Sequence, residues 1–376
     1  MQPDRKLDLS QADRVVVKVG SNVLTEDHGL NLNAIRSITR QICKLRDQHR
    51  EIILVSSGAM ASGVKKLGMG KRPDEIPKRQ AVSAVGQPGL MNAYEKAFAR
   101  FEQKVAQILL THEDLSSRKR YLNARNTLNT LLAWDVVPII NENDTVSIEE
   151  IKLGDNDNLA AMITLMMDAD ALINLTDIDG LHTRDPRQYS DADLIATVST
   201  IGKTTEEYAS DIPGALGTGG MLSKIKAAKK VTSAGIPMVI ANGLRPNILT
   251  KIFAGKRQGT YFVPKGQRLA SRKCWIAFSL KPLGTIIIDA GAAVAILKNG
   301  KSLLPSGIVA VEDDFGVGAP VEFKDLNDRI LGTGLVNYSA VEIRQIKGLK
   351  SNQIKGVLGH KSYDEVIHRD NLALYD

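Results

Sequence analysis

The sequence has little cysteine, no long hydrophobic run and no hydrophobic leader. Its two cysteines, Cys43 and Cys274, lie far apart and outside any Cys-x-x-Cys spacing, so a disulfide framework is not expected and a reducing compartment fits best. No apolar run approaches the roughly 20 residues that span a bilayer. The first fourteen residues are polar and contain no apolar core of a secretory signal. We therefore expect a cytoplasmic protein.

Several familiar catalytic motifs are also missing. The chain has no Gly-x-x-x-x-Gly-Lys-Ser/Thr loop, which argues against a P-loop kinase, and no protein-kinase signature. Its six histidines show neither paired metal-ligand spacing nor a His-Glu-x-x-His motif, so no protein-bound metal is predicted. If this protein uses ATP, another structural element must bind the phosphates.

The composition is that of a globular protein, and its charge favours an anionic partner. At 376 residues, with 43% hydrophobic residues, the chain is long enough for two domains with substantial cores. The net charge of +7 favours nucleotides, acidic metabolites or RNA as partners. Because the lysines and arginines are scattered along the chain, a merely solvated surplus of charge remains open.

Short apolar segments alternate with amphipathic segments over the first two thirds of the chain. Val15 to Val19 predicts a buried strand, and Ile35 and Ile38 lie at helical spacing in a helix that Asn33 could cap. This alternation predicts a mainly parallel sheet with helices on both faces, and ligands beyond the carboxyl ends of its strands. Further strands are expected at 52–55, 105–110, 136–140, 171–175 and 237–240, with helices around 92–101 and from about 122.

The pattern changes after about residue 260. A connecting helix is expected near 267–280, and short β-rich pieces broken by glycine follow to about residue 360. This predicts a small β-barrel or sandwich. We expect a catalytic domain over residues 1–264, a linker helix over 265–282, a β domain over 283–361 and a C-terminal tail over 362–376.

Two lysines stand next to glycine turns. Lys18 ends a predicted buried strand and is followed by Gly20, which lets a phosphate approach the backbone. The segment 218–224 places two glycines before an amphipathic helix with Lys224 in its first turn, an arrangement that binds anions. Alone, each pattern is also typical of a solvated strand-end lysine or an ordinary glycine-rich loop; together they favour a phosphate site.

Acidic and amide side chains concentrate in two further segments. Asn141 to Asp144 follows a predicted strand, and Gly154 to Asn158 opens a predicted helix. Such groups suit a substrate ammonium group, and a carboxylate among them can hold catalytic lysines. The alternative is structural, with Asp155 or Asp157 capping the helix and a turn at 143–144.

Two strand ends complete the candidate site. Thr176 and Asp177 follow a buried strand and could face a ribose or base, and Ser57 with Gly58 offers a hydroxyl and backbone N–H groups to a carboxylate. Each is equally typical of a tight turn.

In this order, the segments resemble the amino acid kinase family. The motifs are Val-Val-Lys-Val-Gly-Ser, Ser-Ser-Gly-Ala, Asn-Glu-Asn-Asp, Gly-Asp-Asn-Asp-Asn-Leu, Leu-Thr-Asp-Ile-Asp-Gly-Leu and Thr-Gly-Gly-Met-x-Ser-Lys. Asn-Glu-Asn-Asp together with Gly-Asp-Asn-Asp resembles the glutamate 5-kinase branch. Residues 289–339 resemble a PUA domain. The resemblance implies a three-layer αβα fold and transfer of the γ-phosphoryl group of ATP to the γ-carboxylate of L-glutamate, the first step of proline biosynthesis.

The resemblance also implies roles for individual residues. Lys18 and Lys224 would hold the ATP phosphates and Asp157 would orient both lysines. The glutamate-binding residues implied are Ser57, Asp144 and Asn156, with Asp155 close by. The nucleotide-binding residues implied are Lys18, Thr176, Asp177, Thr218, Gly219, Gly220, Met221, Leu222, Ser223 and Lys224. Mg²⁺ would be held mainly through the ATP phosphates.

Partners follow from the same resemblance. It implies inhibition by proline, a tetrameric homo-oligomer, and transfer of the labile acyl phosphate to a reductase. The alternatives are a sibling kinase with another small acceptor, or an RNA-binding or RNA-modifying protein. The second is less favoured, because the C-terminal region shows no aromatic stacking cluster.

Overall fold

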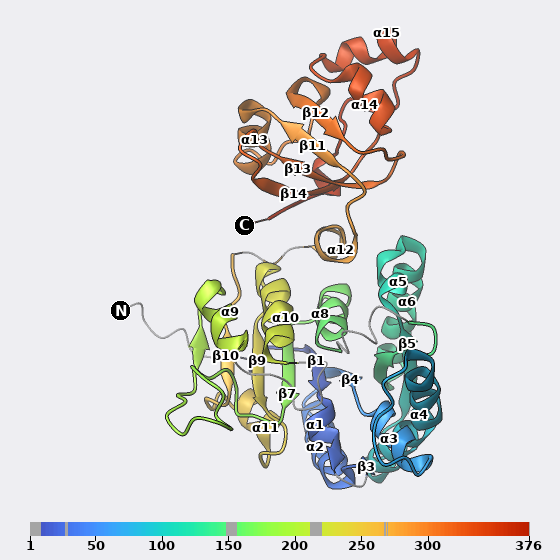
Figure 1. Ribbon diagram of the computed structural model, residues 1–376, viewed down its shortest axis with the longest axis vertical. Helices are drawn as coiled ribbons and strands as arrows, with labels where there is room; N and C mark the ends of the chain where they lie inside the picture. Colours follow the sequence, from blue (N-terminus) through green and yellow to red (C-terminus); the bar gives the residue numbers. More distant parts are fainter. Residues whose placement is uncertain are drawn as a thin grey trace. The chain divides into compact units, whose positions relative to one another are not determined.

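A computed structural model describes residues 9–26, 29–147, 156–210, 220–266, 268 and 270–375 (Figure 1). The chain divides into two compact units, Met1–Arg268 and Leu269–Asp376, and each has its own hydrophobic core. The finer domain boundaries expected from the sequence stay predictions.

The first unit is built on an eight-stranded sheet. Every neighbouring pair of strands is parallel except β9 and β10, which confirms the mainly parallel sheet. In spatial order the strands are β5 (Val105–Leu110), β6 (Val137–Glu142), β4 (Glu51–Ser56), β1 (Arg14–Val19), β7 (Ala171–Thr176), β9 (Met238–Asn242), β10 (Thr260–Phe262) and β8 (Thr197–Val198).

Helices cover both faces of this sheet (Figure 1). The odd-numbered residues of β1, such as Val15 and Val17, share a core with α2, α4 and α11. The even-numbered residues, including Lys18, point to the opposite face, where α8 contacts β1 and β7. The helices are α1 (Ser21–Leu24), α2 (Leu32–Arg46), α3 (Ala59–Lys66), α4 (Ile76–Phe98), α5 (His112–Ser116), α6 (Arg118–Ala133), α8 (Asn156–Met166), α9 (Lys203–Ser210), α10 (Met221–Ser233) and α11 (Ile248–Phe253).

Two helices begin where the sequence did not place them. The cap of α2 is Asn31 rather than Asn33, because the side chain of Asn31 accepts a hydrogen bond of 2.9 Å from the backbone N–H of Ala34. Helix α4 begins at Ile76, well before the expected 92–101 segment, and contains Pro88. Proline and glycine inside a helix hide its extent from sequence patterns.

Two glycines let α3 and α4 approach closely. A Cβ atom on Gly63 would lie 1.8 Å from the backbone oxygen of Val82, and one on Gly86 would lie 1.8 Å from that of Ala59. Any side chain at either position would push the helices apart. This contact fixes α3, which follows Ser57 and Gly58 at the end of β4.

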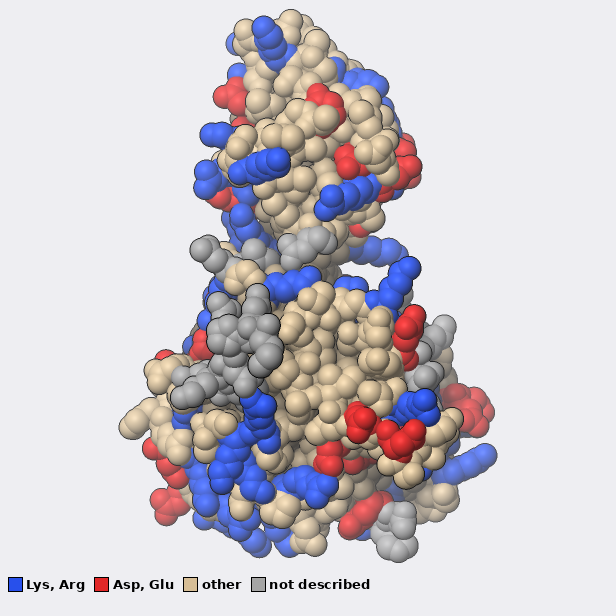
Figure 2. All heavy atoms as spheres, turned by 90° about the vertical axis from the view of Figure 1, so that its left-hand side faces the viewer, with Lys and Arg blue, Asp and Glu red and all other residues tan. Residues whose placement is uncertain are grey.

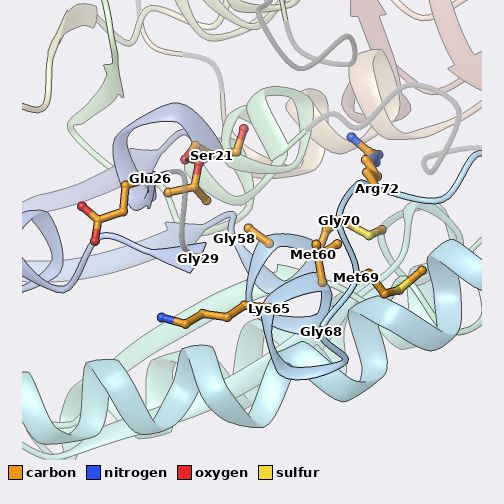
Figure 3. A pocket seen from close by; sticks show the side chains of 13 residues that line it. Ser21, Glu26, Gly29, Gly58, Met60, Lys65, Gly68, Met69, Gly70 and Arg72 are labelled. Atoms are coloured by element: carbon orange, nitrogen blue, oxygen red, sulfur yellow. Dashed lines mark hydrogen bonds between the residues drawn. The ribbon is translucent and has the colours of Figure 1, made fainter.

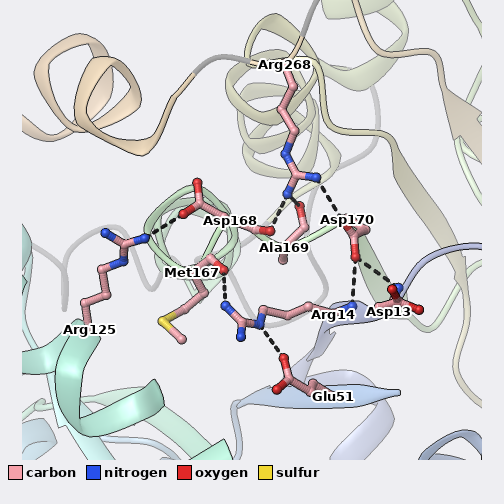
Figure 4. Close-up of polar contacts among 9 residues, drawn as sticks. All are labelled: Asp13, Arg14, Glu51, Arg125, Met167, Asp168, Ala169, Asp170 and Arg268. Atoms are coloured by element: carbon pink, nitrogen blue, oxygen red, sulfur yellow. Dashed lines mark hydrogen bonds and ion pairs between the residues drawn. The ribbon is translucent and has the colours of Figure 1, made fainter. Parts of the chain in front are cut away.

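The amino ends of β1 and β7 are joined by polar contacts (Figure 4). The Asp170 carboxylate accepts hydrogen bonds from the backbone N–H groups of Asp13 and Arg14, at 2.9 and 2.8 Å, and pairs with Arg268 at 2.7 Å. Burial alone raises the pKa of Asp170, but these donors outweigh it and hold the pKa below its ordinary value. These contacts stabilise the sheet at the edge away from the carboxyl ends.

The second unit is strand-rich, as the sequence predicts. Helix α12 lies within the segment expected to form a linker helix and packs against β14 and β15, and β15 adds the segment 372–374 to the sheet. Its elements are α12 (Ser271–Ser279), β11 (Thr285–Ile288), α13 (Ala290–Leu297), β12 (Ile308–Glu312), β13 (Pro320–Lys324), β14 (Ile330–Leu335), α14 (Ala340–Ile346), α15 (Ile354–Leu358) and β15 (Leu372–Leu374), with sheet order β12-β11-β13-β14-β15.

The surface carries the positive surplus that the composition indicates. On the face drawn in Figure 2, Lys and Arg side chains are spread over both units with Asp and Glu side chains between them. Among the described residues, no helix combines the length and the apolar character needed to cross a membrane.

Candidate active site

The centre of the candidate site is the carboxylate of Asp157, in the first turn of α8. Its Oδ1 lies 2.5 Å from the Lys18 ammonium, and its Oδ2 lies 3.1 Å from the Lys224 ammonium. Lys18 comes from β1 and Lys224 from α10, so three separate elements converge here. The side chains are 1% exposed for Asp157 and 6% for each lysine. The structure thus brings together the three residues expected to be catalytic.

These ammonium groups determine the ionisation of Asp157. Burial by itself raises the pKa of this carboxyl group. The adjacent charges of Lys18 and Lys224, with hydrogen bonds from Lys18 and Ser223, outweigh burial and hold the pKa well below its ordinary value. Asp157 is therefore ionised at neutral pH, and the three groups together carry one net positive charge.

Each oxygen of Asp157 also receives one neutral donor. The hydroxyl of Ser223 donates to Oδ2 at 2.5 Å, and the side-chain amide of Asn174 donates to Oδ1 at 2.8 Å. The motif around Ser223 predicted that residue as part of the site, whereas no pattern in the sequence led us to predict Asn174. The available signal was a polar residue between apolar neighbours in the interior of strand β7, Ala-Leu-Ile-Asn-Leu-Thr.

The start of α10 leads directly into this cluster. Gly220 precedes the helix in an extended conformation and has no side chain to cap it. Met221 is buried, and Leu222 is half-buried. The first backbone N–H groups of a helix lack intrahelical partners, so this end of α10 suits an anion beside Lys224.

A second polar group lies at the end of β4. The amide nitrogen of Asn156 donates to the hydroxyl of Ser57 at 2.9 Å, to the backbone oxygen of Ser56 at 3.1 Å and to Oδ1 of Asn141 at 3.0 Å. The Oδ1 atom of Asn156 is buried and has no hydrogen-bond partner among the described residues. The structure thus joins Ser57 and Asn156, two residues expected to bind the acceptor, and adds Asn141.

A pocket of about 470 Å³ opens beside Gly58 (Figure 3). Gly58 has φ = +106°, a conformation that strains other residues, and it forms the turn into α3. Arg72 lies on the pocket wall. Burial and the neighbouring Arg79 lower the pKa of Arg72, while the charge of Asp144 opposes that shift. Asp144 therefore interacts electrostatically with Arg72, a cation on the pocket wall that the sequence did not predict.

Thr176 and Asp177 stand at the carboxyl end of β7. Thr176 lies two residues beyond Asn174 and so on the same face of the sheet as the Asp157 cluster. Its hydroxyl donates to Oδ1 of Asp177 at 3.1 Å, and the Asn22 amide donates to Oδ2 of Asp177 at 3.0 Å. Three expected site residues, Asp155, Thr218 and Gly219, lie outside the described residues.

Comparisons with known proteins identify, in each unit, the family that its sequence motifs resemble. The amino acid kinase family profile matches residues 13–242, and the PUA domain profile matches residues 284–358. The glutamate 5-kinase of Syntrophus aciditrophicus is 51% identical over 374 residues, covering 100% of this chain and 97% of that protein. The glutamate 5-kinases of Caldanaerobacter subterraneus subsp. tengcongensis and Geobacter sulfurreducens are each 49% identical, covering 96% and 97% of this chain and 98% of each relative.

A solved structure also matches the chain. The UMP kinase of Bacillus anthracis covers 68% of this chain and 97% of its own, at 14% identity and a TM-score of 0.47. The family assignment depends instead on the profile match and the full-length relatives. The chain belongs to the amino acid kinase family and carries a PUA domain.

Proposed function

We propose that this chain phosphorylates the γ-carboxylate of L-glutamate with ATP to give L-glutamyl 5-phosphate, the first step of proline biosynthesis. The observation that carries the proposal is the convergence of Lys18 and Lys224 on the buried carboxylate of Asp157. The full-length similarity to curated glutamate 5-kinases supports the choice of substrate.

The chemistry needs charge neutralisation more than proton transfer. A γ-carboxylate oxygen attacks the γ-phosphorus of ATP, the bond to the β,γ-bridging oxygen breaks, and ADP leaves with that electron pair. The nucleophile is already an anion, so no general base is required. Its repulsion from the phosphate is offset by Lys18 and Lys224, which also stabilise the charge on the transferring group. Asp157 keeps both ammonium groups in place.

The pocket beside Gly58 suits the amino-acid end of the acceptor. Ser57 and the Oδ1 atom of Asn156, which has no hydrogen-bond partner among the described residues, offer hydrogen bonds next to the cluster. Asp144 would pair with the α-ammonium group, and Arg72 would pair with the α-carboxylate. A charged pair of this kind favours a zwitterion over an acceptor without both charges.

ATP would lie against the carboxyl ends of β1 and β7. The start of α10, from Gly220 to Ser223, would contact the phosphates, and Thr176 with Asp177 would contact the nucleoside. Mg²⁺ fits as an ion carried on the ATP phosphates, where it would add to the positive charge of the two lysines.

A hydroxylamine assay tests the reaction, because an acyl phosphate is converted to a hydroxamate. The protein would be incubated with Mg-ATP and glutamate, aspartate or N-acetylglutamate. We expect product with glutamate alone. We also expect Lys18→Ala and Lys224→Ala to lower kcat by roughly 10²–10³-fold, the scale of losing a preorganised electrostatic group.

Lys229 supplies a matched control on the same helix as Lys224. Its side chain is 58% exposed and pairs with Glu206. Lys229→Ala should therefore retain wild-type kcat. Wild-type turnover in Lys18→Ala and Lys224→Ala would refute the proposed roles, and product from another acceptor in place of glutamate would favour a sibling kinase.

The remaining partners stay predictions from the resemblance. They are inhibition by proline, a homo-oligomer that is a tetramer, and transfer of the acyl phosphate to a reductase. Location in the cytoplasm also stays a prediction. Adding proline to the hydroxylamine assay checks the first of these directly.

A further inference from the structure

Asn174 is an unusual residue for its position in the fold. It lies in the middle of β7, a strand of the parallel sheet in which every residue is buried, and its own exposure is 0%. Asparagine is disfavoured in strands, and burying an amide is costly unless both ends are hydrogen-bonded. Here Oδ1 of Asn174 is buried without a hydrogen-bond partner among the described residues. Stability alone gives a poor account of this residue.

The sheet register places Asn174 directly beside a catalytic lysine. Asn174 is the partner of Lys18 across the parallel pair β1–β7, and the partner of Ile240 on the other side. Lys18 and Asn174 therefore point to the same face and contact the same atom, Oδ1 of Asp157, at 2.5 and 2.8 Å. The amide must present its nitrogen here, because the reverse orientation would place two oxygens against each other.

Among the described residues, four of the donors to the Asp157 carboxylate form two matching pairs. Oδ1 receives the ammonium of Lys18 and the neutral amide of Asn174. Oδ2 receives the ammonium of Lys224 and the neutral hydroxyl of Ser223. When ATP phosphates attract the two lysines, the neutral donors can still hold the carboxylate.

We propose that Asn174 is a positioning residue for phosphoryl transfer: its amide fixes Oδ1 of Asp157 and thereby aims the Lys18 ammonium at the transferring phosphate. This inference rests on the proposed roles of Lys18, Asp157 and Lys224. Asn174 adds no charge, so the net positive charge of the cluster remains available to ATP. The carbonyl oxygen of Asn174, which has no hydrogen-bond partner in the described part of the chain, then lowers stability in return for this contact.

Asn174→Leu is the first test, because leucine is similar in size and suits an apolar strand. We expect kcat to fall about 10-fold to 100-fold, the scale of losing a hydrogen bond to a charged group, while KM for glutamate stays unchanged. The thermal midpoint should stay the same or rise, because leucine removes a buried carbonyl oxygen that no described residue hydrogen-bonds. Thr164→Val is the matched control: Thr164 is a fully buried polar residue on α8, bonded to the backbone oxygen of Ala160, and its variant should keep wild-type kcat.

Asn174→Asp gives a second, independent readout. The groups facing the new carboxyl are Asp157 from α8, Lys18 from β1 and Lys224 from α10. Burial, Asp157 and bound ATP favour its neutral form, and the lysines oppose this. The neutral form can donate its O–H to Asp157 as the amide does, whereas the ionised form repels it. The ratio of variant to wild-type kcat should therefore rise as pH falls, since kcat reports the substrate complex.

The two variants make the inference refutable even if one fails to fold. The inference is wrong if Asn174→Leu keeps wild-type kcat. It is also wrong if Asn174→Leu has a lower thermal midpoint while its folded fraction is fully active. If Asn174→Leu does not fold, a kcat ratio for Asn174→Asp that is independent of pH overturns it. Inactive Lys18→Ala with fully active Asn174→Leu refutes this inference alone, whereas fully active Lys18→Ala refutes the proposed function.

Discussion

Replacing Asp157 with asparagine removes the carboxylate that Lys18 and Lys224 share, while keeping the size of the side chain. The two ammonium groups are almost fully buried and would face each other without that negative charge. At an effective dielectric constant of about 20, charges separated by the 3.1 Å of the Lys224 pair attract by roughly 5 kcal/mol, much of which desolvation offsets. Removing one partner of a buried pair costs about 3–5 kcal/mol of folding free energy.

The kinetic effect of Asp157→Asn should separate positioning from binding. The net charge near the phosphates becomes more positive by one, so KM for ATP should not rise. The lysines lose their fixed positions, so kcat should fall by roughly 10²–10³-fold. The assay is steady-state hydroxamate formation between pH 6 and pH 9, together with thermal unfolding.

Asp170→Asn is the matched control at the other end of the same strands. Asp170 also has a lowered pKa and an arginine partner, Arg268, but it joins the amino ends of β1 and β7 (Figure 4). Its variant should lose stability and keep wild-type kcat. Wild-type kcat in Asp157→Asn, or an equal loss of kcat in both variants, would refute the reasoning.

Three other predictions follow from the same geometry. Asp144→Ala and Arg72→Leu should each raise KM for glutamate by roughly 10-fold or more with little change in KM for ATP, measured by steady-state kinetics; a higher KM for ATP would contradict the pocket assignment. Ser223→Ala should lower kcat about 10-fold, because it removes one neutral hydrogen bond to a charged group, and an unchanged kcat would contradict this. Asp157 and Asp170 have lowered pKa values, so their stabilisation is complete above about pH 4 and is lost as pH falls further. Thermal midpoints between pH 7 and pH 3 check this, and a flat profile would refute it.

The sheet could be predicted because its signal is local. Apolar runs such as 15–19 and 171–175 give buried parallel strands, and the structure places β1 and β7 at these positions. Helix starts depend on side-chain hydrogen bonds that a pattern does not show, so Asn31 and not Asn33 caps α2. The three-residue strand β10 and its antiparallel pairing with β9 were not predicted, because such a short segment has no measurable periodicity.

The site was predictable only where a motif marks it. Lys18, Asp157 and Lys224 stand in recognisable segments, and the structure brings them together. Asn174 and Arg72 stand in no such motif. Their positions depend on the sheet register and on the loop before α4, and both are set by packing between distant parts of the chain.

Charged groups lie at both ends of β1 and β7, but only the buried cluster at the carboxyl ends indicates function. At the amino end, Asp170 binds two backbone N–H groups and a partly exposed arginine, which stabilises the start of both strands. At the carboxyl end, Asp157 holds two lysines that are almost fully buried and carry a net positive charge. Replacing a buried ion pair with apolar residues of similar volume is often neutral or stabilising, so folding alone gives no reason to retain this cluster. A buried cluster with a net positive charge instead suits an anionic ligand, and ATP with a carboxylate acceptor supplies it.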